Sequence, residues 1–246
     1  MRILVVGAGA TGGYFGGRLL QAGQDVTFLV RPKRAAELAS TGLVIKSPHG
    51  DMTLGNPPTV QAAGLRQTFD LVLLSCKAFD LEDAITSFAP AAGPRTAILP
   101  LLNGMRHLET LDATFHRERV LGGLCSLAVT LNEKREVVHL APMQSLRFGE
   151  RNGGTSERVR AIAEAFAGAS CGAQASETII QDMWEKCRTC GKNGCFWRRS
   201  PARPAGCAHP SARSSLRLAD TISSLPCWMK SPVLRKRQVT RRAKSS

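Results

Sequence analysis

Short, almost continuous apolar runs alternate with helix-like segments through the first 186 residues. The runs lie at residues 3–6, 25–30, 71–75 and 97–101. The intervening segments with helical spacing of apolar positions lie at residues 13–22, 34–40 and 81–88. Parallel strands buried on both faces carry apolar residues at nearly every position, whereas half-exposed strands alternate. The pattern therefore predicts an α/β fold with a doubly wound parallel sheet.

Other segments predict an antiparallel extension of that sheet. Residues 43–46 and 52–54 flank a His49-Gly50-Asp51 turn, which is typical of a hairpin. Further strands are predicted at residues 120–124, 137–140 and 146–148, with Pro142 in a loop between the last two. An amphipathic helix is predicted at residues 157–166, and another begins at residue 179.

The composition changes abruptly after residue 186. Residues 1–186 contain 19 of the 33 Lys and Arg residues and 18 of the 19 Asp and Glu residues, so nearly all of the net charge of +14 belongs to residues 187–246. That segment also scatters Pro and Arg without a helical or strand period. Because it offers little apolar surface to offset the entropy of ordering, we predict an irregular basic tail over 187–246.

The first loop carries the clearest chemistry. Six residues after the first strand match Gly-x-Gly-x-x-Gly and open a helix: Gly7, Ala8, Gly9, Ala10, Thr11 and Gly12. In such a loop the first glycine permits a tight turn, the second lets the backbone approach a pyrophosphate, and the third lets the helix pack against the strand. The phosphates lie at the helix N-terminus. The pattern predicts a dinucleotide-binding, Rossmann-type domain over residues 1–168.

The turn after the second strand favours NADP over NAD. An acidic side chain there would bind the ribose hydroxyls of NAD, but this chain has Arg31-Pro32-Lys33-Arg34. Cations at this position suit the 2′-phosphate of NADP. We predict Arg31 as the primary phosphate partner and Lys33 or Arg34 as a second. The alternative is an exposed turn whose basic side chains are merely solvated.

Three polar side chains stand out as candidate ligands, since ligands of such sheets bind beyond the carboxyl ends of the strands. They are Lys77, Asn103 and Lys186. Their segments and three other features match motifs of one enzyme family. The features are the glycine motif, Arg31, Lys77-Ala78, Asn103-Gly104-Met105, Gly149-Glu150 and Trp184-x-Lys186. Through these features residues 1–186 resemble the ketopantoate reductases, also called 2-dehydropantoate 2-reductases.

The resemblance implies an activity and roles for these residues. The activity is NADPH-dependent reduction of 2-dehydropantoate (ketopantoate), a small 2-keto acid, to (R)-pantoate in pantothenate and coenzyme A biosynthesis. Lys186 would be the general acid that protonates the C2 oxygen. Asn103 would bind substrate and help to place the nicotinamide, and Lys77 would line the same cleft in contact with substrate and cofactor.

The resemblance also implies an all-α second domain that closes the cleft. Residues 169–186 would begin this domain, and its remainder is truncated or missing as a readable pattern. We therefore expect the chain to bind NADP and to reduce the keto acid weakly or not at all. A cofactor-binding protein that does not catalyse stays open as an alternative.

Two hypotheses address the tail. A shifted reading frame near codon 187 explains the lost periodicity and the scarcity of acids. The rival is an appended module, in which Cys187-x-x-Cys190, Cys195, Cys207 and His209 ligate zinc and the basic end contacts nucleic acid. We favour the first, because Cys207-x-His209 is tighter than the usual second ligand pair, and we expect no nucleic-acid partner.

The remaining expectations concern location and assembly. The chain shows no charged leader followed by a long apolar segment and a cleavage site, so we expect a cytoplasmic protein with reduced thiols and no membrane partner. His107, His116 and His139 lack metal-ligand spacing, and we predict no metal site. A homodimer is expected if the second domain is intact.

Overall fold

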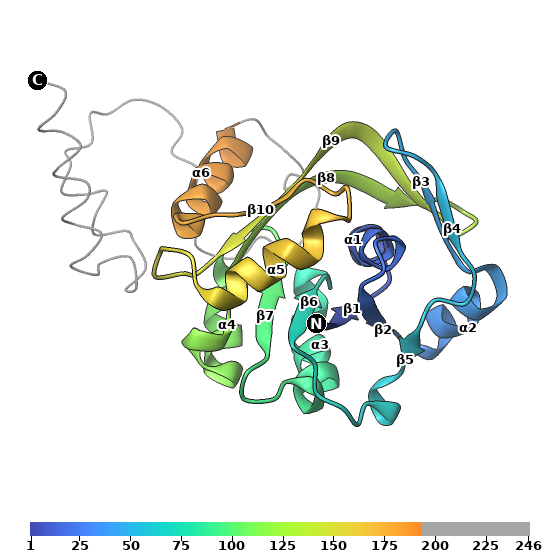
Figure 1. The fold of residues 1–246 in the computed structure, drawn as a ribbon, viewed down its shortest axis with the longest axis horizontal. Helices are drawn as coiled ribbons and strands as arrows, with labels where there is room; N and C mark the ends of the chain where they lie inside the picture. Colours follow the sequence, from blue (N-terminus) through green and yellow to red (C-terminus); the bar gives the residue numbers. More distant parts are fainter. Residues whose placement is uncertain (193–246) are drawn as a thin grey trace, which may run out of the picture. The chain divides into compact units, whose positions relative to one another are not determined.

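The computed structural model describes residues 1–192 (Figure 1). Both tail hypotheses lie almost entirely outside the described residues. At the start of the predicted tail, however, helix α6 (Ile179–Lys192) continues without a break through residues 187–192. The prediction of an irregular segment from residue 187 is therefore wrong for those six residues.

The first sheet is the predicted parallel one. Its order is β5-β2-β1-β6-β7, and all its neighbours pair in parallel. Its strands are β1 (Arg2–Val6), β2 (Asp25–Leu29), β5 (Thr59–Val60), β6 (Leu71–Leu74) and β7 (Ala97–Pro100). The helices of the described chain, besides α6, are α1 (Ala10–Gln21), α2 (Pro32–Thr41), α3 (Leu81–Phe88), α4 (Arg106–Phe115) and α5 (Glu157–Ala167). Short 3₁₀ turns are η1 (Ala62–Gly64), η2 (Ala78–Asp80), η3 (Ala89–Ala91) and η4 (Arg117–Arg119).

The predicted antiparallel extension is a separate second sheet. Its strands are β3 (Leu43–Lys46), β4 (Met52–Leu54), β8 (Gly122–Leu131), β9 (Val137–Gly149) and β10 (Ala173–Ala175). The order is β10-β9-β3-β4, and β8 also pairs with β9. The β3–β4 hairpin and the β8–β9 pair are antiparallel, whereas β3 and β10 run parallel to β9. Strand β10 is an edge strand of this sheet and lies within residues 169–186, where the sequence predicts the start of a helical domain.

Strand β9 is continuous where the sequence predicts a loop at Pro142. The register with β8 jumps there: Leu127 pairs with Gln144, whereas Val129 pairs with His139. The extra residues of β9 therefore lie in a bulge, where the regular ladder is interrupted. A bulge is one of the few places in a sheet that tolerate proline, because proline has no N–H to donate.

Helix α1 lies between the two sheets (Figure 1). Strands of the first sheet send alternate side chains toward it, among them Val5 and Leu73, and these join one core with Phe15 of α1 and Phe148 of β9. Helix α5 adds Ile162 to the same core. Burial on both sides of α1 explains why this helix is apolar around most of its circumference.

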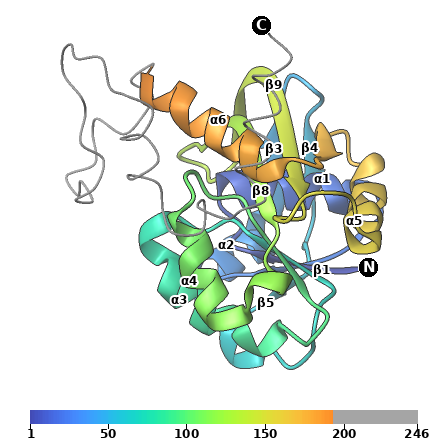
Figure 2. The same ribbon diagram turned by 90° about the vertical axis from the view of Figure 1, so that its left-hand side faces the viewer.

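Helices α3 and α4 cover the opposite face of the first sheet (Figure 2). There the other alternate side chains, such as Val72 and Ile98, pack with Phe88 of α3 and Phe115 of α4, whose rings stack with centroids 5.0 Å apart. Helix α4 is absent from the sequence prediction. The burial of its face shows that residues 106–115 do carry an apolar helical stripe.

His107 of α4 is buried, and among the described residues its Nε2 makes no hydrogen bond. Burial, and secondarily the charge of Arg151, lowers the pKa of His107 to about 4. In the unfolded chain this pKa is about 6.5. The unfolded state therefore takes up the proton first as the pH falls, so stability present above about pH 6.5 is lost as the pH falls towards about 4.

We expect the free energy of unfolding to fall by about 2 kcal/mol between pH 7 and pH 5 because of His107. Urea unfolding at the two pH values measures this. The variant His107→Gln removes the titrating group and should flatten the dependence. If the free energy of unfolding changes equally with pH in the parent and in the variant, His107 is not the cause of the pH dependence.

Candidate active site

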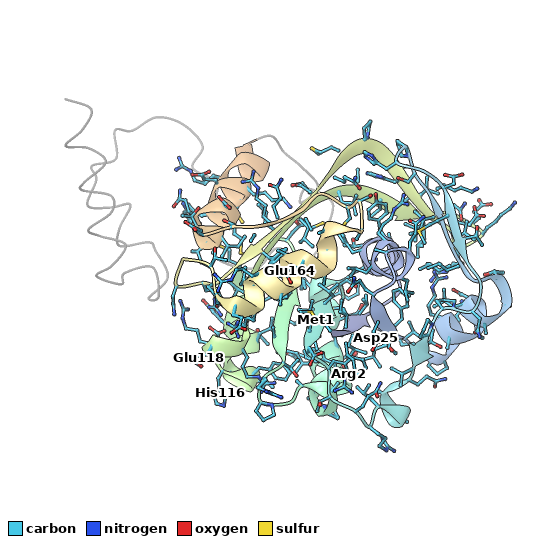
Figure 3. All side chains as sticks on the ribbon, viewed as in Figure 1. Met1, Arg2, Asp25, His116, Glu118 and Glu164 are labelled. Atoms are coloured by element: carbon cyan, nitrogen blue, oxygen red, sulfur yellow. The ribbon has the colours of Figure 1, made fainter. Side chains whose placement is uncertain are left out.

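The predicted site residues meet at one edge of the first sheet. Because β1, β2, β6 and β7 are parallel, their carboxyl ends share that edge. The glycine motif follows β1, and the residues that follow the other three strands are Arg31, Lys77 and Asn103. Arg2 and Asp25, which pair at the amino ends of β1 and β2, mark the opposite edge (Figure 3).

The glycine loop has the conformation that its pattern predicts. Gly7 has φ +93°, a left-handed conformation suited to glycine. A Cβ on Gly12 would lie 2.1 Å from the Gly7 carbonyl oxygen and 2.2 Å from Ser75 Oγ. Ser75, at the end of β6, donates to the carbonyl oxygens of Val6 (2.8 Å) and Gly7 (3.1 Å). The loop is thus pressed between the start of α1 and the end of β6.

The start of α1 fits a pyrophosphate. A Cβ on Gly9 would meet no atom within 4 Å, so the backbone faces open space there. Gly9 is the N-cap of α1, no side chain caps the helix, and its first turn holds no acid. The backbone N–H groups of a helix N-terminus bind anions in this situation. Residues Gly7 to Gly12 could therefore hold the phosphates of a dinucleotide.

Arg34 is not placed to serve as a second 2′-phosphate partner. It is buried, its Nε donates to the Ala8 carbonyl oxygen at 2.9 Å, and its Nη1 lies 2.9 Å from Glu37 Oε2. Arg135, in the β8–β9 turn, contacts the same carboxylate at 3.0 Å. Hydrogen bonds from Arg34 and Arg135 lower the pKa of Glu37. Arg34 therefore fastens α2 to the glycine loop, and Lys33, which is exposed, stays the candidate second cation.

Arg31 is accessible but has an acidic neighbour that the sequence analysis missed. Its side chain is 72% exposed, and its Nη2 lies 2.9 Å from Asp80 Oδ1. Asp83 lies farther away, at 4.0 Å. The hydrogen bond and charge of Asp80 raise the pKa of Arg31. Asp80 is 49 residues away in sequence, and no local pattern predicts the pairing.

Lys186 and Asn103 come together as the resemblance implies. Lys186 Nζ donates to Asn103 Oδ1 at 3.0 Å and also to the carbonyl oxygen of Cys125 in β8. Lys186 and Asn103 line a pocket together with the following residues: Leu102, Gly104, Gly123, Leu124, Met183 and Cys187. An ammonium group has three protons, so two acceptors leave one proton for a ligand.

A glycine pair brings α6 close enough to place Lys186. Gly122 of β8 pairs in register with Gly149 of β9. A Cβ on Gly122 would lie 2.7 Å from the Ile179 side chain, and one on Gly149 would lie 2.0 Å from the Ser176 carbonyl oxygen. Ile179 is fully buried at this contact. Lys186 lies two helical turns further along the same side of α6, where it reaches Asn103.

Lys77 lies at the same edge but does not join the Lys186–Asn103 contact. It is exposed, and its Nζ lies 5.6 Å from the ring centroid of Phe79, which is 81% exposed. Within residues 1–192, no hydrogen bond links Lys77 to Asn103 or Lys186. Its predicted contacts with substrate and cofactor stay predictions.

The thiols of Cys76, Cys125 and Cys171 are not activated. Burial raises the pKa of Cys76 and of Cys125 to about 11 and that of Cys171 to about 12.

In the described part of the chain, no group of three or more His, Cys, Asp or Glu side chains is arranged to hold a metal ion. None of the helices within residues 1–192 combines the length and apolar character that a membrane crossing requires.

Comparison with known proteins decides the family. The model of the family "Ketopantoate reductase PanE/ApbA" matches residues 3–153. The chain belongs to this family. This match confirms the predicted fold class and the family resemblance found in the sequence. The members of this family are oxidoreductases.

Individual relatives agree with the family match. The uncharacterized oxidoreductase YkpB of Bacillus subtilis is 45% identical over 186 residues, which cover 76% of this chain and 61% of the relative. The crystal structure of 2-dehydropantoate 2-reductase from Geobacter metallireducens is 33% identical, has a TM-score of 0.71 and covers 77% of this chain and 62% of that one. D-mandelate dehydrogenase with NADH and anilino(oxo)acetate, at 22% identity and a TM-score of 0.68, shares the fold over 78% of this chain and 62% of its own.

The chain thus spans about three fifths of the length of the relatives that it matches, 61% for the Bacillus subtilis protein. The part matched by the family model, residues 3–153, contains the glycine loop and Arg31.

Proposed function

We propose that the chain binds NADPH and takes part in the reduction of a small 2-keto acid, with 2-dehydropantoate as the substrate that the family match favours. The observation that carries the proposal is the position of Lys186, whose ammonium group is held by Asn103 and the Cys125 carbonyl oxygen. This group lies in a pocket next to the carboxyl edge of the sheet, where the glycine loop also lies.

The cofactor would be held by the glycine loop and Arg31. Backbone N–H groups at the start of α1 would bind its pyrophosphate, and the guanidinium of Arg31 would bind its 2′-phosphate. Lys33, on the same exposed turn, would add a second cation. When bound, NADPH supplies the hydride that reduces the keto carbon.

The substrate would be held by Lys77, which follows β6, by Asn103, which follows β7, and by Lys186 of α6. Lys186 donates a proton to the C2 oxygen as negative charge develops there. Asn103 and the Cys125 carbonyl oxygen orient the ammonium group, and the Asn103 amide also binds substrate. Lys77, a cation at the same edge, favours binding of the substrate carboxylate.

Turnover tests the reaction directly. Consumption of NADPH is followed after addition of ketopantoate or of a panel of other 2-keto acids. We expect slow turnover, because the second domain that the resemblance implies has no readable pattern after residue 186. NADPH binding without turnover of any 2-keto acid would support the cofactor-binding protein that does not catalyse.

We predict that the protein binds NADPH more tightly than NADH and that Arg31→Ala removes most of this preference. The reason is that a guanidinium forms charge-assisted hydrogen bonds with a phosphate, and an alanine cannot. We expect a loss of about tenfold in NADPH affinity, with NADH affinity changed less than about twofold. Titration calorimetry with the two cofactors measures both constants.

Lys33→Ala is the matched control for that prediction, because it removes a cation from the same turn. It should change the NADPH preference less than Arg31→Ala does, since a flexible exposed ammonium contributes less than a bidentate guanidinium. Equal affinities of the parent protein for NADPH and NADH, together with no effect of Arg31→Ala on either affinity, would contradict the NADP assignment.

A further inference from the structure

Arg31 and Asp80 form an ion pair at the place where a 2′-phosphate would bind. Arg31 Nη2 lies 2.9 Å from Asp80 Oδ1, the Arg31 side chain is 72% exposed, and that of Asp80 is 29% exposed. Among the described residues, Asp83 is the other acid in contact with Arg31, at 4.0 Å and 82% exposed. The cation that the sequence assigns to the phosphate is therefore already occupied by a carboxylate.

The fold makes this pairing. Strands β2 and β6 both flank β1, so the turn after β2 and the segment after β6 meet at the same edge. The segment after β6 turns back at Lys77, whose carbonyl oxygen accepts from the Asp80 N–H at 2.9 Å. Asp80 is the N-cap of α3, yet its side chain does not cap that helix. Its carboxylate reaches Arg31 instead.

A carboxylate in this position discriminates against a phosphate in two ways. It competes for the same guanidinium, and its negative charge repels the phosphate at short range. It does not oppose the ribose of NADH, because a carboxylate can accept hydrogen bonds from ribose hydroxyls, as acids in NAD sites do. Asp80 is therefore expected to weaken the binding of NADPH without weakening the binding of NADH.

We propose that Asp80 is a specificity-determining residue of the cofactor site, which weakens the preference for NADPH over NADH that Arg31 confers. The proposal rests on the proposed role of Arg31 as the 2′-phosphate partner. It gives the chain a more balanced use of the two cofactors than the basic turn alone indicates.

The test compares Asp80→Asn with the parent protein for both cofactors. Asparagine keeps the size of the side chain and suits a helix N-cap, so α3 should be unaffected. We expect NADPH to bind about three- to tenfold more tightly to the variant, because an exposed competing charge is removed. NADH should bind equally well or more weakly. The NADPH effect should shrink at high salt, since exposed charges are screened.

Glu82→Gln is the matched control, because it removes one acidic charge from the first turn of the same helix. In the described part of the chain, Glu82 forms no ion pair with Arg31. Glu82→Gln should change the ratio of the two affinities by less than about twofold. Asp83→Asn should give an intermediate effect, since its contact with Arg31 is longer.

The outcomes separate this inference from the proposed function. If the parent shows no NADPH preference and Arg31→Ala changes nothing, the NADP site itself is wrong. If Arg31→Ala removes a preference but Asp80→Asn leaves the ratio within twofold, only the inference about Asp80 fails. Equal weakening of both cofactors by Asp80→Asn would also overturn it, because that result indicates a structural role for the residue.

Discussion

Lys186→Met is expected to lower kcat/KM for 2-keto acid reduction at least a hundredfold. A positioned general acid contributes about 10²- to 10⁴-fold to such a reaction, and methionine has similar length but no proton to donate. Affinity for NADPH should stay within about twofold, because Lys186 is not among the groups assigned to the phosphates. Initial rates with saturating NADPH and cofactor titrations measure the two quantities.

The relevant quantity is the kcat/KM of each variant divided by that of the parent protein, because the absolute rate is expected to be low. Lys186→Arg is the control for charge: it keeps a cation beside Asn103 but cannot give up a proton at working pH. It should therefore fail to restore the rate. A Lys186→Met protein that retains the parent kcat/KM would exclude Lys186 as the general acid.

Gly12→Ala is expected to lower the free energy of unfolding by about 3 kcal/mol. The added Cβ would lie 2.1 Å from the Gly7 carbonyl oxygen, and a backbone atom cannot move aside without displacing the loop or α1. Dinucleotide affinity should fall more than about tenfold at the same time, because the displaced loop no longer presents its N–H groups. Urea unfolding and cofactor titration measure the two effects.

Gly9→Ala is the matched control for that substitution. Its Cβ would enter open space, and Gly9 has φ −78°, which alanine adopts readily. Stability should therefore stay within about 1 kcal/mol of the parent. Dinucleotide affinity should nevertheless fall about tenfold, since the methyl group occupies the space proposed for the pyrophosphate. Equal loss of stability in the two variants would refute this division of roles between Gly9 and Gly12.

The local elements were largely predictable from the sequence. The parallel strands β1, β2, β6 and β7, the glycine loop and the β3–β4 hairpin lie where the patterns indicate, whereas the short parallel strand β5 was not predicted. The errors arose where neighbours in space override the local pattern. Pro142 reads as a loop, but it lies in a bulge of β9 because β8, β3 and β10 hold the strand on either side.

One further error has the same origin. Residues 173–175 are too short and polar to predict a strand, yet they pair with Leu146, Arg147 and Phe148 of β9. Helix α6 continues past residue 186, where the change in composition predicts irregular chain. Helix α4 carries an apolar stripe that the sequence analysis overlooked, so that omission is a missed signal rather than a tertiary effect.

By itself, the sequence determined the parts whose chemistry is local: a glycine loop between a strand and a helix, and a basic turn after the second strand. Only the tertiary structure decided how distant groups pair. It placed Lys186 beside Asn103, buried Arg34 against Ala8, and joined Arg31 to Asp80. The order of the strands sets these contacts, which join residues 83, 26 and 49 positions apart. Hydrogen bonds and ion pairs act only over a few ångströms, so their partners cannot be identified until the sheet has brought the segments together.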